Sequence, residues 1–188
     1  MGRPLEPGTS SLMFHGYDTD EERRPVRELY GVFRRPKNDA DRGAEPLAAV
    51  AWSGIPWGAE IAMDEGRVFL SGLGGDEDMI YAAPLGDDRL VLAVLPNGGG
   101  GSARPGPDGL YMLTGELETG ALVVHGIVAD SVEAVDIVVA GATHEAAMGE
   151  NGFGLRLEDT HEADQEQLVL HRRDGTTNEI GLRPRPDA

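Results

Sequence analysis

Residues 120–157 constrain the fold most, because their apolar side chains come in short runs that turn residues separate. The runs at 122–124 and 127–128 precede Asp130-Ser131, a pair whose short polar side chains suit a turn. A longer run at 132–139 follows, and a glycine ends it. Short runs that are rich in Val and Ile and bounded by Gly, Asp and Ser are typical of strands rather than helices.

Similar runs recur about every ten residues over most of the chain. They lie at 61–63, 68–70, 79–83, 90–95, 110–114, 153–157, 167–170 and 179–182. Turn residues predict hairpins between 61–63 and 68–70, between 79–83 and 90–95, and at Asp174-Gly175. We therefore expect a mainly β fold, either an antiparallel sandwich or a partly closed barrel, with a short N-terminal helix.

The short helix is predicted for residues 26–33, where four apolar side chains fall at i, i+3, i+4 and i+7: Val26, Leu29, Tyr30 and Phe33. Pro25 precedes this stripe and Pro36 follows it, which suits a helix that begins and ends there. Residues 38–42 could add one more helical turn. We interpret the stripe as a helix face that packs on the sheet.

A length of 188 residues fits one domain. Residues 1–24 are rich in Pro, Gly, Ser and charge, so we expect a flexible lead-in, followed by a single β-rich domain over residues 25–188. Residues 96–109 contain four consecutive glycines and two further prolines, and they predict a long exposed loop within that domain.

The chain is strongly acidic, with 33 Asp and Glu against 16 Lys and Arg and a net charge of −17. Such a surface repels phosphate backbones and anionic lipids, which argues against nucleic-acid binding and membrane binding. A basic protein partner or a cation would be attracted instead. The simpler interpretation is that the charge only keeps the protein soluble.

The chain has no cysteine, which excludes disulfides, thiolate zinc sites and thiol catalysis. No apolar run approaches the roughly 18 residues that span a bilayer, and the N-terminus lacks the pattern of a signal peptide. We expect a soluble, cytoplasmic protein, or an exported or membrane-anchored one if an N-terminal segment was removed.

Four residues are candidates for ligand binding: Trp52, Trp57, His125 and His144. The two tryptophans lie five residues apart, with Gly54 and Pro56 between them, and could line a pocket. Indoles in a small aliphatic domain more often fill the rim of the core. A histidine within or beside a strand could join a carboxylate in a metal or catalytic site, but more often it is a half-buried packing residue.

The neighbouring carboxylates of Asp76, Glu77 and Asp78 could hold a divalent cation such as calcium. A solvated acidic loop is the more common role of such a run. We expect no other cofactor.

Known catalytic and nucleotide-binding motifs are absent from the sequence. G-x-S-x-G, S-x-x-K, H-E-x-x-H, the P-loop and G-x-G-x-x-G do not occur. The sequence therefore favours a protein that is not an enzyme.

Two segments of the chain carry recognisable motifs. VRELYGVFRRPKNDAD, at residues 26–41, is similar to a helix with an F-x-x-x-R-R-P-x-x-x-x-D pattern. Residues 126–153 are similar to a G-x-V-x-D-G-V strand pair with an Asn-rich hairpin. Together the two segments resemble uncharacterised proteins of high-GC Gram-positive bacteria. The chain departs from these patterns at Ser131, where glycine is usual, and at Glu150, where asparagine is common. The resemblance implies a fold and no chemistry, and many of those proteins carry a membrane anchor or export signal that this chain lacks.

The leading hypothesis is a non-catalytic structural or protein-interaction β-domain. One alternative is a metal-dependent or hydrolase-like enzyme with a site on the sheet face. The other is a module that binds a divalent cation or a small ligand. An enzyme would need a histidine and a carboxylate within hydrogen-bond reach.

Overall fold

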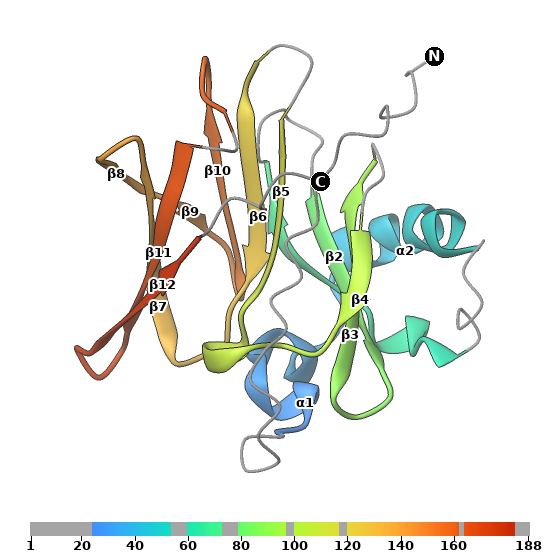
Figure 1. Ribbon diagram of the computed structural model, residues 1–188. Coiled ribbons are helices and arrows are strands. Elements are labelled where there is room, and N and C mark those ends of the chain that lie inside the picture. The colour runs from blue at the N-terminus through green and yellow to red at the C-terminus, as the bar shows by residue number, and fades with distance from the viewer. Residues whose placement is uncertain are drawn as a thin grey trace.

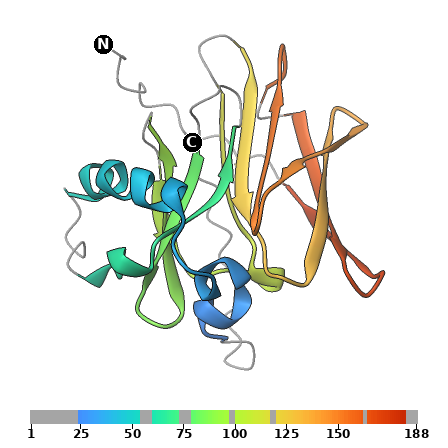
Figure 2. The same ribbon diagram turned by 180° about the vertical axis from the view of Figure 1, so that it is seen from behind.

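Three antiparallel sheets and one longer helix make up the structure (Figure 1). This computed structural model describes residues 24–53, 60–72, 79–96, 100–116, 120–161 and 164–182. The layers follow one another in the order α2, sheet A, sheet B and sheet C, and Figure 2 shows the same stack from behind. The sheets do not close into a barrel, so the predicted mainly β, sandwich-like fold is confirmed.

Each sheet has four strands. Sheet A contains, in spatial order, β1 (Arg67–Ser71), β2 (Met79–Leu85), β3 (Arg89–Leu95) and β4 (Gly100–Ala103). Sheet B contains β5 (Tyr111–Glu116), β6 (Leu122–Ile127), β10 (Gly152–Leu157) and β9 (Ala147–Met148). Sheet C contains β12 (Thr177–Gly181), β11 (Gln165–Arg172), β7 (Val132–Val139) and β8 (Ala142–Glu145).

Sheet B is the middle layer and is covered on both faces. One core lies between sheets A and B and includes Phe69, Leu92 and Ile127. A second core lies between sheets B and C and includes Val124 and Leu168. This position explains why every residue of β6 is buried, since a strand that packs on both faces has no solvent-facing side.

The turn at Asp130-Ser131 carries the chain from one sheet to another. It joins β6 of sheet B to β7 of sheet C, so these consecutive strands do not pair with each other. β8, β9 and β10 then bring the chain back to sheet B, where β10 pairs with β6. Residues 120–157 therefore supply strands to sheets B and C and line the core between these sheets.

The predicted N-terminal helix is interrupted. α1 (Val26–Leu29) and the 3₁₀ turn η2 (Gly31–Arg34) are separated by Tyr30, whose backbone is extended. All four residues of the predicted stripe nevertheless pack in the core between sheets A and B: Val26 and Tyr30 are buried there, and Leu29 and Phe33 are partly buried against it. Val32, which is outside the stripe, is buried in the same core. Two further 3₁₀ turns, η4 (Met63–Glu65) and η5 (Pro107–Gly109), lie in the connections.

α2 (Asp39–Trp52) has 14 residues and is much longer than the single turn expected at 38–42. A capping box starts it, because the Asn38 side chain accepts from the Asp41 N–H and the Asp41 side chain accepts from the Asn38 N–H. Ala44, Ala48 and Trp52 lie on its buried face and form a third core with sheet A. Gly43 and Pro46 concealed this helix in the sequence, because both residues disfavour a helix interior. Burial of that face stabilises the helix in spite of them.

Two predicted β features differ in the structure. The hairpin between 61–63 and 68–70 is wrong: Ile61 makes one isolated bridge to Leu85, and β1 pairs with β2 instead. The 96–109 loop contains β4, which pairs with β3 at the edge of sheet A. Local patterns identify extended segments, but tertiary packing selects their partners. The hairpins that join β2 to β3 and β11 to β12 are confirmed.

Glycine is required where β1 meets the connection between β9 and β10. A Cβ on Gly149 would lie 2.2 Å from the Phe69 carbonyl oxygen, and a Cβ on Gly152 would lie 2.7 Å from the same oxygen. We expect Gly149→Ala to lower the free energy of unfolding by about 1–3 kcal/mol, because a backbone atom must move to make room. Urea denaturation measures the change.

The matched control is Gly43→Ala on α2, where a Cβ would meet nothing within 4 Å. Alanine is the better helix former by about 1 kcal/mol, so this variant should be as stable as the wild type or more stable. Equal destabilisation by both variants would contradict the proposed close approach at Gly149.

Candidate functional site

The ligand-binding candidates that the structure describes do not form one site. Trp52 lies between α2 and sheet A, His125 lies on the middle sheet, and His144 lies on β8 of sheet C. Trp57 and the acidic run Asp76, Glu77 and Asp78 lie outside the described residues.

Trp52 is a core residue. Its side chain is 6% exposed, and its ring centroid lies 5.8 Å from that of Tyr81 on β2. Both residues belong to the apolar core between α2 and sheet A. The structure therefore gives Trp52 a packing role, which was the more common of the two interpretations.

His125 is buried at the interface between sheets A and B. It pairs with Leu113 of β5 and Gly154 of β10, so it shares the face on which Leu113 enters the core between these sheets. Its Nε2 has no hydrogen-bond partner within the described parts of the chain. Burial lowers the pKa of His125 to about 4, so the ring is neutral at physiological pH.

His144 pairs directly with Ile137 of β7. Paired residues share a face, so His144 lies at the rim of the core-facing side of sheet C. His171 on β11 does meet a carboxylate, since its Nε2 lies 2.8 Å from Asp136 Oδ2 on β7. This pair lies on the outer face of sheet C and is partly exposed.

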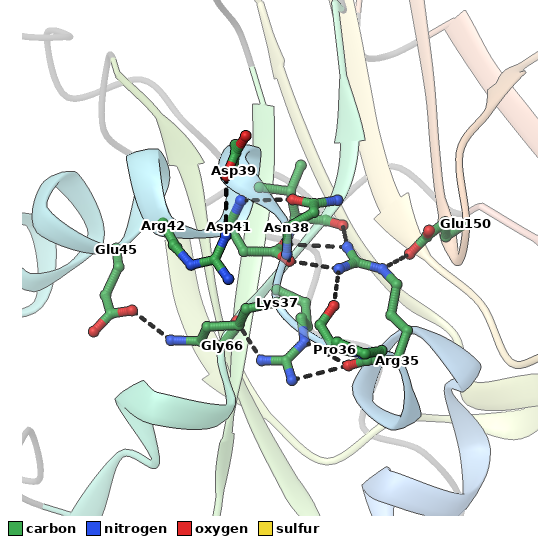
Figure 3. Close-up of polar contacts among 12 residues, drawn as sticks. Arg35, Pro36, Lys37, Asn38, Asp39, Asp41, Arg42, Glu45, Gly66 and Glu150 are labelled. Carbon is green, nitrogen blue, oxygen red and sulfur yellow. Dashed lines mark hydrogen bonds and ion pairs between the residues drawn. The ribbon is translucent and has the colours of Figure 1, made fainter.

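One polar network centres on Arg35, between α2, β1 and the β9–β10 connection (Figure 3). Its guanidinium donates to both carboxylate oxygens of Asp41, at 2.5 and 3.1 Å, and to Glu150 at 2.5 Å. The Arg67 guanidinium donates to the Arg35 carbonyl oxygen at 3.1 Å. Arg35 therefore connects the N-terminal segment to sheets A and B.

Asp41 is fully buried at the centre of this network. Besides Arg35, its side chain accepts from the Val68 N–H at 2.7 Å and from the Asn38 N–H at 2.8 Å. Burial by itself would raise the pKa of Asp41, but these hydrogen bonds outweigh it and lower the pKa below the ordinary value. Asp41 is thus held as a carboxylate and caps α2 while it anchors β1.

A second polar network centres on Asn151 and Asp130. The Asn151 amide accepts from the Val32 N–H at 3.1 Å and donates to the Val128 carbonyl oxygen and to Asp130, each at 3.0 Å. Asp130 also accepts from the Gly31 N–H at 2.6 Å and forms an ion pair with Arg34. Burial would raise the pKa of Asp130, but these donors lower it overall.

The two networks unite the two segments that carry the resemblance. Arg34, Arg35 and Asp41 come from the R-R-P-x-x-x-x-D segment, and Asp130 and Asn151 come from the strand-pair segment. From the sequence we interpreted these motifs as structural, but the sequence did not indicate which residues they contact. Side chains of the two segments form hydrogen bonds and ion pairs with each other. The networks therefore connect η2 and Arg35 to the turns of sheets B and C and to β1.

Among the residues that the structure describes, no three His, Asp or Glu side chains are placed to hold a metal ion. No described helix has the length and apolar character that a membrane crossing requires. No family model, curated protein or solved structure matches this chain, so the resemblance to uncharacterised bacterial proteins stays a prediction.

His125 makes stability depend on pH. Its pKa is about 4 in the folded chain and near the ordinary 6.5 in the unfolded chain, so protonation favours unfolding. The free energy of unfolding should fall by about 3 kcal/mol as the pH drops from 6.5 to 4. His125→Leu should remove most of this slope in urea denaturation measured across that range. An unchanged slope would show that other groups cause it.

Asn151→Asp should destabilise the fold by about 3 kcal/mol or more, because it turns a buried donor into a carboxylate that faces Asp130 and a carbonyl oxygen. The matched control is Asn38→Asp at the N-cap of α2, where aspartate caps as well as asparagine. Chemical denaturation compares the two variants. Similar small losses for both would contradict the role of Asn151 as a buried bridge.

Proposed function

We propose that this chain is a non-catalytic interaction domain that binds a basic protein partner through the outer face of sheet C. The observation that carries the proposal is a row of carboxylates across this face. Cross-strand pairing aligns Glu179, Val169, Asp136 and Glu145 on β12, β11, β7 and β8. Neighbouring strands lie about 4.8 Å apart, so the three carboxylates stand within reach of one basic segment.

The outer face has no described element over it. Sheet C is the last layer of the stack on its side of the molecule (Figures 1 and 2). Glu145 and Glu179 are exposed, whereas Val138 and Val169 are half-buried between them. Half-buried valines offer an apolar floor for the methylene stems of lysine or arginine, while the carboxylates receive the charged ends.

The face carries acidic charge without basic residues to neutralise it. The rows beside the carboxylates hold only uncharged residues and one histidine, and no Arg or Lys occupies an outward position on the described strands of this sheet. These neighbours are Thr177, His171 and Ala134 on one side, and Gly181, Gln167, Val138 and Thr143 on the other.

Hydrogen bonds hold two of the three carboxylates, Glu179 and Asp136, in place. Gln167 Nε2 donates to Glu179 Oε2 at 2.8 Å, and His171 Nε2 lies 2.8 Å from Asp136 Oδ2. Preorganised acceptors lose less side-chain freedom when a partner binds. The net charge of −17 adds long-range attraction for a basic partner and repulsion for nucleic acid.

The test measures binding of a fluorescent arginine-rich peptide to the whole chain by anisotropy. The triple variant Asp136→Asn, Glu145→Gln, Glu179→Gln should weaken binding by about tenfold or more, because it removes the charges that the peptide meets. Binding to the wild type should also weaken as salt rises.

The control triple variant Glu28→Gln, Glu60→Gln, Asp64→Asn removes the same number of carboxylates, all of them exposed, from the α1 and η4 region. It should bind almost as the wild type does, with only the small loss that follows from the lower net charge. Equal weakening in both triple variants would show that overall charge, and not this face, attracts the peptide. No binding by the wild type would refute a basic partner.

A further inference from the structure

Asn151 and Gly152 form an Asn-Gly pair where β10 begins. Asparagine loses its side-chain amide most readily before glycine, because glycine has no Cβ to hinder the backbone nitrogen that attacks the side chain. We infer that Asn151 is a deamidation site that the folded chain protects, and that the reaction makes the release of η2 irreversible. This site lies apart from the proposed basic-partner surface and does not depend on it.

The reaction consumes water and releases ammonia. The backbone nitrogen of Gly152 attacks Cγ of Asn151, the bond from Cγ to Nδ2 breaks, and ammonia leaves with the proton of the attacking nitrogen. Water then opens the cyclic imide at either of its carbonyl groups, so the product is aspartate or isoaspartate. Isoaspartate carries the main chain through the side-chain carbon and thereby lengthens the backbone.

The folded chain holds the Asn151 side chain in place and keeps water from it. The residue is only 3% exposed. Its Oδ1 accepts from the Val32 N–H at 3.1 Å, and its Nδ2 donates to the Val128 carbonyl oxygen and to Asp130 Oδ1, each at 3.0 Å. Attack by the Gly152 nitrogen has to turn Cγ away from these partners. The reaction therefore requires a local opening of the structure.

η2 is the element whose release would open the site. The Val32 N–H binds Asn151, the Gly31 N–H donates to Asp130 Oδ1 at 2.6 Å, and Arg34 forms an ion pair with Asp130. The opposite side of the site belongs to the ladder of β6 and β10, which many backbone hydrogen bonds hold together. A 3₁₀ turn of four residues has no such ladder, so its release costs less than separation of the strands.

The product does not fit the closed site. Both hydrogen bonds that Nδ2 donates are lost with ammonia, and the new carboxylate would face Asp130 and the Val128 carbonyl oxygen without a donor towards either. Isoaspartate would also lengthen the backbone where the carbonyl oxygen of Asn151 accepts from the Val128 N–H. η2 should therefore stay released in every molecule that has reacted.

The fold requires both members of this reactive pair. A Cβ on Gly152 would lie 2.7 Å from the carbonyl oxygen of Phe69, so a larger residue does not fit there. Asn151 supplies both an acceptor and donors, which an aspartate or a serine cannot supply together. The close packing that stabilises the closed state thus keeps a group that reacts when the state opens. Deamidation at Asn151 records how long the chain has spent open.

The first experiment measures deamidation by peptide mapping and mass spectrometry on the whole chain at neutral pH, with and without guanidinium chloride. The second Asn-Gly pair of the sequence, Asn97-Gly98, lies outside the described residues and serves as the chemical reference. In denaturant the two asparagines should react at similar rates. Without denaturant Asn151 should react about a hundredfold more slowly or less, because its rate follows the population of the open state.

The second experiment tests whether η2 controls the reaction. Arg34→Gln should speed deamidation of Asn151 in the folded chain by about threefold or more, because it removes the ion pair with Asp130. The matched control is Arg42→Gln, which removes the exposed ion pair with Asp39 on α2. The control should react as the wild type does.

The third experiment tests irreversibility. Wild-type chain is allowed to react in denaturant and is then refolded and separated by ion exchange. Molecules that reacted at Asn151 should be cleaved by trypsin after Arg27 or Arg34 about tenfold faster than unreacted molecules, because η2 stays released. Molecules that reacted only at Asn97 carry the same added charge and should be cleaved as the unreacted chain is.

Four outcomes would overturn the inference. The first is an Asn151 that does not react in denaturant while Asn97 does. The second is an equal rate for Asn151 with and without denaturant. The third is an equal effect of Arg34→Gln and Arg42→Gln, since another part of the chain must then open. The fourth is equal tryptic cleavage of molecules that did and did not react at Asn151.

Discussion

The burial of sheet B on both faces is the constraint on which the rest of the structure depends. A sheet in the middle of the stack has no solvent-facing side, so its central strand β6 must be apolar throughout. Each face of sheet B forms one wall of a core, so sheet B contributes to two of the three cores. These two cores join the N-terminal half of the chain to the C-terminal half. The exception within β6 is His125, which burial keeps neutral and which makes this interface sensitive to acid.

Polar networks complement the cores at the side where the layers meet the N-terminal segment. Arg35 and Asp41 join η2 and α2 to β1, and Asp130 and Asn151 join η2 to the turns of sheets B and C. Asp41, the buried carboxylate of these networks, accepts several hydrogen bonds, which compensate for the loss of water. The same groups are thereby occupied in holding the fold together.

The two outer layers of the stack differ in chemistry. Sheet C presents three carboxylates without basic neighbours on its outer strand positions, whereas α2 presents an apolar face whose surrounding charges are paired. The two surfaces lie at opposite ends of the stack.

The sequence by itself determined the β class, the strand runs of residues 120–157 and the hairpins at 86–88 and Asp174-Gly175, because these depend on local periodicity and turn residues. It also marked Arg35, Asp41, Asp130 and Asn151 as members of motifs, without their contacts. Tertiary structure alone decided that β6 and β7 belong to different sheets, that β1 pairs with β2, and that α2 continues through Gly43 and Pro46. Likewise, it separated Trp52, His125 and His144 into different layers and brought His171 to Asp136. These features depend on packing between residues distant in the chain, which local sequence patterns do not encode.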